Sequence, residues 1–298
     1  MPALPPDRRR HADPPGKLRP RSCYAELHCR TNFSFLEGAS HPDHLVNKAA
    51  ELGLTALAIT DRNSVAGVVR AHVAAKEANL KLLVGAEITP TDTPPVVLLA
   101  TNRLGYARLS TLITHGRRAA AKGECSLTFD DVAQHASGLI ACVPLLPYLD
   151  AERGGDKNHG SVQQYHECFG DRCYGLAELH CGPHDQLLLD RMGKLAVEAQ
   201  VPLAAANDVH YHVPEQQPLH DVLTAIRHGC TVAELGGRRF SNAERHLKSA
   251  ETMRRLFAAV PDAVLRTKEV ADRCGFSLDE LRYEYPEELC PEGQNTLE

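Results

Sequence analysis

The sequence predicts an α/β protein in which parallel strands form a sheet or a barrel. Short apolar strands and amphipathic helices alternate, with short links, in about seven strand–helix units up to residue 213. From residue 214 onward only helical periodicity is found. The chain has 298 residues, 43% of them hydrophobic, which is enough to bury a large core. We therefore expect a barrel at residues 23–213 and a small helical part of it, or extension to it, at 214–282.

Each element follows from its local pattern. The first strand starts at Tyr24. In the helix that follows, Ser40 is the expected N-cap, Pro42 lies in the first turn and Gly53 ends the helix. We expect further strands at residues 55–60, 81–88, 95–100, 138–143, 173–179 and 202–207. The expected further helices are 64–79, 102–122, 128–136 (capped by Thr128), 185–200, 220–228 (ending at Gly229), 249–259 and 261–274. Residues 144–160 are rich in Pro, Gly and charge and predict a loop.

The two ends and the overall composition exclude some classes of protein. Residues 1–22 hold six Arg or Lys against two Asp and predict a disordered basic arm, which either contacts DNA phosphates or is simply solvated. The net charge of −5 argues against nucleic-acid binding through overall charge. The ten cysteines are scattered without a Cys-x-x-Cys pair, so we expect free thiols. Without an apolar run of about 20 residues or a secretory signal, we expect a cytoplasmic protein with no membrane contact.

Four of the expected strands end in side chains that bind metals. These side chains are His28 after the first strand, Asp61 after the second, Glu87 at the third, and Asp208 with His210 after the last. Because the carboxyl ends of parallel strands meet at one rim, we expect them to lie together. Mixed imidazole and carboxylate ligands suit Zn²⁺, Mn²⁺ or Fe²⁺, and two or three such ions activate water for attack on a phosphate. A single Asp at a strand end is often only a turn former, and a single His is often only a hydrogen-bonded core residue. The prediction of a shared metal site therefore depends on four strand ends showing the same pattern.

Six motifs carry a resemblance to a known family. They are LHCRTNFSFLEGAS at 27–40, AITDRNS at 58–64, VGAE at 84–87, NDVHY at 207–211, LHDVL at 219–223 and HLKS at 246–249. Together they resemble the N-terminal PHP (polymerase and histidinol phosphatase) domain of bacterial C-family DNA polymerases. The resemblance is strongest to the error-prone, damage-inducible branch related to the polymerase III α subunit. It implies a distorted (β/α)7 barrel whose metal-competent members hold up to three ions and act as phosphoesterases or proofreading nucleases.

This sequence departs from the family pattern at several ligand positions. The family's His-x-His at the first strand is here His28-Cys29-Arg30, and its Asp-His after the second is Asp61-Arg62. Near Leu145, where metal-competent polymerases tend to place a cysteine, the sequence has Pro144-Leu145-Leu146. The family's central histidine has no clear counterpart. His115 is a candidate, although its pattern is typical of a surface helix residue.

An arginine at a metal position changes the chemistry expected there. Arginine stays protonated and has no lone pair to donate. At roughly 4 Å and an effective dielectric constant of about 20, its charge opposes a dication by about 8 kcal/mol. We therefore predict that Arg30 and Arg62 replace metals and pair with Asp61, Glu87 or Asp208. A single residual Zn²⁺ or Mn²⁺, or none, would remain; the alternative is that both arginines turn to solvent and leave a vacant site.

The resemblance implies a function for a longer parent protein. That parent would be a DNA-directed DNA polymerase acting in translesion synthesis and induced mutagenesis, with two Mg²⁺ on palm-domain aspartates outside this chain. Residues 283–298 would be a linker toward that palm, and the partners would be the rest of the polymerase chain, DNA, the sliding clamp and mutagenesis accessory proteins. For this chain we favour a catalytically silent structural and interaction module. The alternatives are an active metal-dependent phosphoesterase or 3′–5′ exonuclease, and a nucleic-acid-binding module using the basic arm with Arg227, Arg238 and Arg239.

Overall fold

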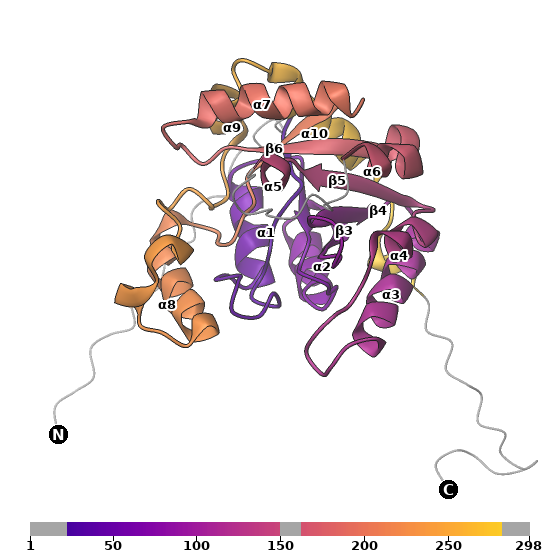
Figure 1. Cartoon of the computed structure of the whole chain (residues 1–298), viewed down its shortest axis with the longest axis horizontal. Coiled ribbons are helices and arrows are strands. Elements are labelled where there is room, and N and C mark those ends of the chain that lie inside the picture. Colours follow the sequence, from indigo (N-terminus) through magenta and orange to yellow (C-terminus); the bar gives the residue numbers. More distant parts are fainter. Residues whose placement is uncertain (1–22, 150–161, 282–298) are drawn as a thin grey trace, which may run out of the picture.

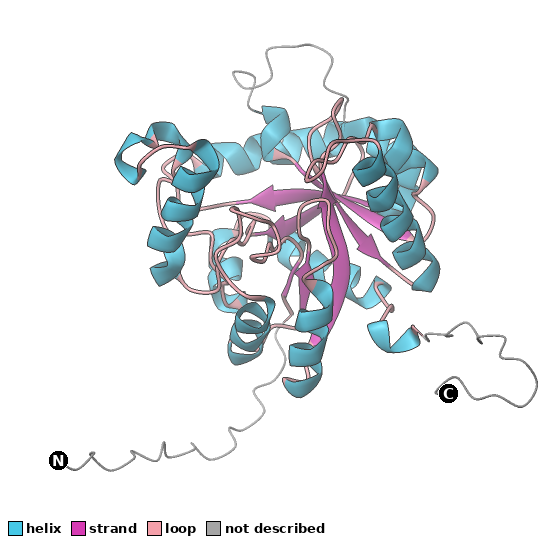
Figure 2. Ribbon diagram, turned by 90° about the horizontal axis from the view of Figure 1, so that it is seen from below, coloured by secondary structure: helices cyan, strands magenta, loops and turns pink. Residues whose placement is uncertain are grey.

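One seven-stranded sheet organises the computed structural model, which describes residues 23–149 and 162–281. The strands lie side by side in chain order and are β1 (Ala25–Glu26), β2 (Ala56–Ile59), β3 (Lys81–Ile88), β4 (Val96–Ala100), β5 (Leu139–Pro144), β6 (Cys173–Glu178) and β7 (Leu203–Ala206). A parallel bridge between Cys29 and Val209 joins the chain beyond β1 to the chain beyond β7. The sheet therefore nearly closes into a barrel, with helices around it (Figure 2). This confirms the predicted distorted α/β barrel.

Strand β4 is the source of the distortion. The strands β1, β2 and β3 are mutually parallel, as are β5, β6 and β7, but β4 is antiparallel to both of its neighbours. The expectation of parallel strands throughout is therefore wrong at β4. The cause is the link from β3 to β4, residues 89–95, which is too short for the crossover of a dozen or more residues that parallel strands need.

The helices surround the sheet and cover one of its ends. They are α1 (Pro42–Glu51), α2 (Val68–Glu77), α3 (Arg103–Arg118), α4 (Phe129–Gln134), α5 (Leu146–Leu149), α6 (Val162–Phe169), α7 (Asp185–Glu198), α8 (Gln217–His228), α9 (Ala250–Leu256) and α10 (Pro261–Arg273). Short 3₁₀ turns lie at Gly170–Arg172, Pro214–Gln216, Val232–Glu234, Gly236–Arg238 and Leu278–Glu280. Figure 1 shows α7, α9 and α10 gathered on one side of the strands, with α8 apart from them.

Sequence reasoning missed two helices and misplaced one cap. Helix α5 lies in the segment predicted as a loop, and α6 was not predicted although its buried Val162, Tyr165 and Phe169 have helical spacing. His41, not Ser40, stands at the N-cap of α1, because the Ser40 hydroxyl is hydrogen-bonded to His212 instead. The cap predicted at Thr128 is confirmed as a reciprocal capping box with Asp131 at the start of α4.

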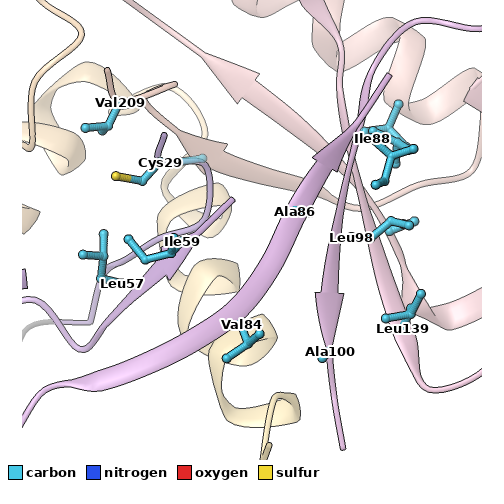
Figure 3. Close-up of a cluster of buried hydrophobic side chains, with 14 of the residues drawn as sticks. Cys29, Leu57, Ile59, Val84, Ala86, Ile88, Leu98, Ala100, Leu139 and Val209 are labelled. Atoms are coloured by element: carbon cyan, nitrogen blue, oxygen red, sulfur yellow. The ribbon is translucent and has the colours of Figure 1, made fainter. Parts of the chain in front are cut away.

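The strands bury side chains on both faces. The outer face packs against the helices through larger side chains such as Leu57, Ile59 and Ile88, part of which Figure 3 shows. The inner face combines the small Ala56, Ala58, Ala204 and Ala206 of β2 and β7 with larger side chains such as Leu83, Ile140 and Tyr174 from the strands between them, and together they fill the interior of a small barrel. The same inward alternation continues along the strands to Glu87, Glu178 and Asp208. Polar side chains therefore gather where the strands end.

Helix α10 closes the other end of the barrel. The Thr267 hydroxyl accepts from the backbone N–H of Ala25 at 3.0 Å, and the Arg266 guanidinium donates to the Leu203 carbonyl. Lys81 Nζ donates to the Ala271 carbonyl at 2.6 Å. Because these contacts lie at the starts of β1, β7 and β3, the end of the barrel that α10 leaves uncovered is the one at which the strands terminate. The boundary predicted at residues 213 and 214 stays a prediction.

Several sequence expectations concern parts outside the barrel core. The predicted basic arm at 1–22 and linker at 283–298 lie outside the described residues. The nine cysteines within the described ranges are free thiols, as predicted, and Cys290 lies beyond them. None of the helices in the described part of the chain combines the length and the apolar character needed to cross a membrane.

Candidate functional site

Arg30 lies at the centre of a polar network at the carboxyl end of the strands. Its side chain is only 8% exposed. One terminal nitrogen, Nη1, donates to Asp208 Oδ1 and lies 2.6 Å from His210 Nε2. The other, Nη2, donates to Glu87 Oε2. The guanidinium therefore bonds three of the five side chains that the sequence predicts as metal ligands.

His28 is held between two carboxylates next to this guanidinium. Its Nδ1 lies 2.7 Å from Glu178 Oε1, and its Nε2 lies 2.9 Å from Glu87 Oε2. Burial acts to lower the pKa of His28, but hydrogen bonds to Glu178 and Glu87 outweigh it and raise the pKa above its ordinary value. Since both ring nitrogens face carboxylate oxygens, the charged imidazolium, a donor at both nitrogens, satisfies this geometry.

Glu87 and Asp208 are the carboxylates that accept from the guanidinium of Arg30. Burial favours the neutral form of Glu87, but Arg30, His28 and Arg62 together hold its pKa well below the usual range. Asp208 is shared between two guanidiniums, with Oδ1 accepting from Arg30 and Oδ2 from Arg245. Two buried cations, Arg30 and His28, are thus matched by carboxylates that hydrogen-bond them, which is the condition for keeping such charges away from water.

His210 has the opposite protonation state from His28. Its Nδ1 lies 3.0 Å from the backbone carbonyl of Glu37, so this nitrogen carries the proton and Nε2 accepts from Arg30. Burial and the neighbouring Arg30 charge lower the pKa of His210 to about 3. His220 packs edge-on against His210, with ring centroids 5.1 Å apart. Burial and His210 also lower the pKa of His220 to about 3.

Arg62 lies at the outer edge of the network. Its Nη1 is 2.6 Å from Glu37 Oε1 and its Nε is 3.5 Å from Glu87 Oε1, while 42% of the side chain is exposed. Arg227 of α8 approaches the same Glu37 oxygen at 3.1 Å. Neither Arg30 nor Arg62 therefore turns away from the carboxylates into solvent.

Asp61 accepts hydrogen bonds within the turn that follows the first strand. One of its oxygens accepts from the backbone N–H of Thr31 and from the Ser34 hydroxyl, each at 2.7 Å, and the other accepts from the Thr31 hydroxyl at 2.9 Å. Burial raises the pKa of Asp61. Among the described residues these donors contact both oxygens of Asp61, which holds the turn after the first strand. The carboxylates nearest the two arginines are Glu87 and Asp208 for Arg30 and Glu37, which was not predicted, for Arg62.

Sequence reasoning missed three members of the site. Glu178 is the last residue of β6 and Glu87 the last but one of β3, so the same strand-end rule could have found Glu178. Glu37 and Arg245 lie in irregular segments, where no periodic signal marked them. The candidate His115 lies elsewhere, 57% exposed on α3 and 3.4 Å from Asp131.

The side chains at this site can be compared with the ligands that the metals implied by the resemblance would need. His28, Glu178 and Asp208 each offer a ligand atom within 4.8 Å of the others and form a candidate triad. However, both oxygens of Asp208 accept from arginines, and both nitrogens of His28 face carboxylates. Arg30 also places a fixed positive charge beside the triad. The described residues therefore do not fit a cluster of two or three ions.

Comparisons with known proteins identify the family of this sequence. The family model of the PHP domain matches residues 26–176. The error-prone DNA polymerase of Rhodopirellula baltica is 46% identical over 283 residues, covering 92% of this chain and 24% of that relative. The error-prone DNA polymerase of Methylococcus capsulatus is 46% identical over 275 residues, covering 92% of this chain and 25% of its own length.

The chain thus spans about a quarter of the length of the curated relatives it matches. Among solved structures, a Bifidobacterium adolescentis protein described as a metal-dependent phosphoesterase is 19% identical, with a TM-score of 0.47, covering 78% of this chain and 95% of its own. The family model alone covers half of the chain. The chain belongs to the PHP-domain family.

Proposed function

We propose that this chain is the PHP domain of an error-prone DNA polymerase that acts in translesion synthesis and induced mutagenesis. Within that polymerase the barrel would be a structural and interaction module without polymerase or hydrolytic activity of its own. The observation that carries this proposal is the buried guanidinium of Arg30, bonded to Glu87, Asp208 and His210 where a metal cluster would need free lone pairs. The 46% identity to error-prone polymerases supports the parent's identity.

In this proposal Arg30 cross-links the strand ends, as a bound metal ion would. It follows β1 and bonds Glu87 of β3 and Asp208 beyond β7, so one fixed cation joins three strand ends. Unlike a bound ion, the guanidinium is covalently attached and does not exchange. It also supplies no Lewis-acid centre and cannot hold a water for attack on a phosphate.

The remaining functions belong to the longer chain. Nucleotidyl transfer would use two Mg²⁺ held by carboxylates outside these residues, and DNA, the sliding clamp and mutagenesis accessory proteins would be partners of the whole polymerase in the cytoplasm. In this chain His28, Glu178 and Asp208 would hold at most one Zn²⁺ or Mn²⁺, in competition with Arg30 and Arg245 for Asp208.

Measurements of bound metal and of hydrolysis test directly whether this domain is catalytically inactive. The purified chain is dialysed against Zn²⁺ or Mn²⁺, analysed for bound metal, and assayed on a chromogenic phosphodiester and on single-stranded DNA. We expect at most one equivalent of metal and no hydrolysis above the protein-free rate. Two or more tightly bound equivalents, together with hydrolysis that disappears in Asp208→Asn, would contradict the proposal.

The candidate triad favours one competing function, a metal-dependent phosphoesterase or 3′–5′ exonuclease. Under that alternative Mn²⁺ would displace Arg30 from Asp208 and hydrolysis would rise with Mn²⁺ concentration. For a nucleic-acid-binding module, Arg227 and Arg239 are already near carboxylates, at 3.1 Å from Glu37 and 3.6 Å from Asp221. Salt-dependent DNA binding that is lost on deleting residues 1–22 would support that function instead.

A further inference from the structure

Three histidines lie close together on the surface beside the first turn of α1. His41 is the N-cap of this helix, His44 lies in its first turn, and His212 follows β7 in the chain. The ring of His44 contacts the other two, with its centroid 5.4 Å from that of His41 and 5.2 Å from that of His212. His41 and His44 are exposed, and His212 is half-buried. None of the three hydrogen-bonds the Arg30 guanidinium, so the network at the barrel mouth does not explain why they lie together.

Backbone contacts fix the two segments that carry these rings. The Ala39 N–H donates to the His210 carbonyl at 2.8 Å, and the His212 N–H donates to the Ser40 hydroxyl at 2.9 Å. The Ser40 oxygen also lies 2.7 Å from His212 Nδ1. When Nδ1 carries the proton and donates it to this oxygen, Nε2 keeps its lone pair free. Metal-bound histidines usually have this arrangement, because their second ring nitrogen donates to an oxygen.

The spacing of the rings matches that of imidazoles that share one metal ion. A tetrahedral Zn²⁺ binds imidazole nitrogen at about 2.0–2.1 Å, which places the centroids of two such rings about 5.2 Å apart. The two observed separations, 5.4 and 5.2 Å, are close to this value. Among the described residues the ligand atoms that already lie within 4.8 Å of one another are those of His28, Glu178 and Asp208. The nitrogens of the surface histidines therefore converge only after their rings rotate, which the exposed His41 and His44 can do without moving the backbone.

The charges around the three rings permit a cation. Arg70 Nε lies 2.8 Å from Asp43 Oδ1, and Lys48 Nζ lies 3.1 Å from Glu51 Oε2, so each of these neighbouring cations has a carboxylate partner. Both cations also contact water, which screens their charge. Asp43 Oδ2 lies 3.9 Å from His44 Nε2 and adds a negative charge beside the rings. The repulsion that a buried guanidinium exerts at the barrel mouth is therefore absent at this surface position.

We infer that His41, His44 and His212 form a zinc site that joins the start of α1 to the segment after β7. Imidazole ligands suit Zn²⁺, whereas Mg²⁺ and Mn²⁺ prefer oxygen ligands. Water would complete the tetrahedron. The ion would link the chain that follows the first strand to the chain that follows the last one and would stabilise the barrel where those segments meet. This inference does not rest on the proposed function, and the single equivalent of zinc that the chain retains would be held here.

Zinc titration of the 298-residue chain tests the site. We expect one equivalent of Zn²⁺ to bind. Binding should be at least about tenfold weaker in His44→Gln and in His212→Gln, since losing even a residue that only orients a ligand costs that much. His115→Gln, which removes an exposed histidine on α3, is the matched control and should bind zinc as the wild type does. An excess of Mn²⁺ should not displace the zinc.

Thermal unfolding provides a second measurement. Without metal, His44→Gln and His115→Gln should melt at the wild-type temperature, because both replaced side chains are at least half-exposed. Excess Zn²⁺ should raise the melting temperature of the wild type and of His115→Gln by several degrees, and that of His44→Gln by much less. Absence of zinc binding would overturn the inference. So would binding that His44→Gln leaves unchanged, which would assign the ion to His28, Glu178 and Asp208 instead. Hydrolysis of the chromogenic phosphodiester reports separately on the proposed function.

Discussion

Arg30 and Asp208 lie 178 positions apart in the sequence, and their side chains form a buried ion pair at the mouth of the barrel. Each residue comes just after a terminal strand of the sheet, beside the Cys29 and Val209 bridge that joins those strands. The ion pair therefore ties the first strand to the last. Loss of either charge removes one of the two oppositely charged partners of the other, since Asp208 also accepts from Arg245 and Arg30 also donates to Glu87, and the remaining buried charge is then poorly compensated.

Removing the buried guanidinium should destabilise the protein strongly. Arg30→Ala leaves Glu87 and Asp208 without their shared donor, and we expect a loss of about 3–5 kcal/mol in the free energy of unfolding. Arg62→Ala, at the half-exposed edge, should cost no more than about 1 kcal/mol. Urea unfolding at neutral pH measures both. Equal losses for the two variants would show that burial does not set the strength of these pairs.

Replacing Arg30 with a metal ligand should recover metal binding. Arg30→His removes the fixed charge and adds an imidazole next to His28, Glu178 and Asp208. We expect at least one additional equivalent of Zn²⁺ per chain relative to wild type, measured by elemental analysis after dialysis. Arg30→Lys is the matched control, because it keeps the positive charge and should gain none. If Arg30→Lys binds as much zinc as Arg30→His, charge at this position is not what controls metal binding.

The buried neutral histidines predict a loss of stability in mild acid. His210 and His220 have pKa values lowered to about 3 by burial, whereas unfolded histidine has a pKa near 6.5. As pH falls below that value the unfolded state takes up protons that the folded state does not, so stability decreases. His28 acts in the opposite sense, because its raised pKa contributes stability below the unfolded pKa that is lost as pH rises through the folded one. The pKa values of His180, His212 and His246 are lowered by burial as well, so the histidines with lowered pKa values outnumber His28 and we expect a net decrease in stability from pH 7 to pH 5.

His220→Phe isolates one of these contributions. Phenylalanine can keep the stack on Phe240 but has no titrating nitrogen. Between pH 7 and pH 5 the variant should lose about 2 kcal/mol less unfolding free energy than the wild type loses. Urea unfolding at each pH measures this difference. An unchanged pH dependence would mean that His220 takes up its proton in the folded protein as readily as in the unfolded chain.

We expect Asp61 to stabilise the fold without contributing to metal binding. Asp61→Ala removes the acceptor for the Thr31 N–H and the Ser34 hydroxyl, which are buried donors, so we expect a loss of about 1–3 kcal/mol in unfolding free energy. Ser64→Ala, which removes only an exposed turn contact to Ala66, is the control and should lie within about 0.5 kcal/mol of wild type. Metal content should stay the same in both variants. A change in bound metal on Asp61→Ala would return this residue to the ligand set.

Much of the architecture could be predicted because its signals are local. Alternating apolar periods located all seven strands, and the ends of those strands marked His28, Glu87, Asp208 and His210 as neighbours. The direction of β4 could also have been deduced, since the short link before it leaves no room for a parallel crossover. Helix α6 was missed although its buried positions had the helical period.

The sequence by itself determined the strand-end chemistry of this protein, including the arginines at positions where the resemblance implies metal ligands. Only the tertiary structure decided which carboxylates meet them: Glu87 and Asp208 for Arg30, Glu37 for Arg62, and neither arginine for Asp61. The physical reason is the separation along the sequence of the residues that interact. A strand or helix is specified by side chains a few positions apart, whereas ion-pair partners are chosen by distances between segments that only barrel closure brings together.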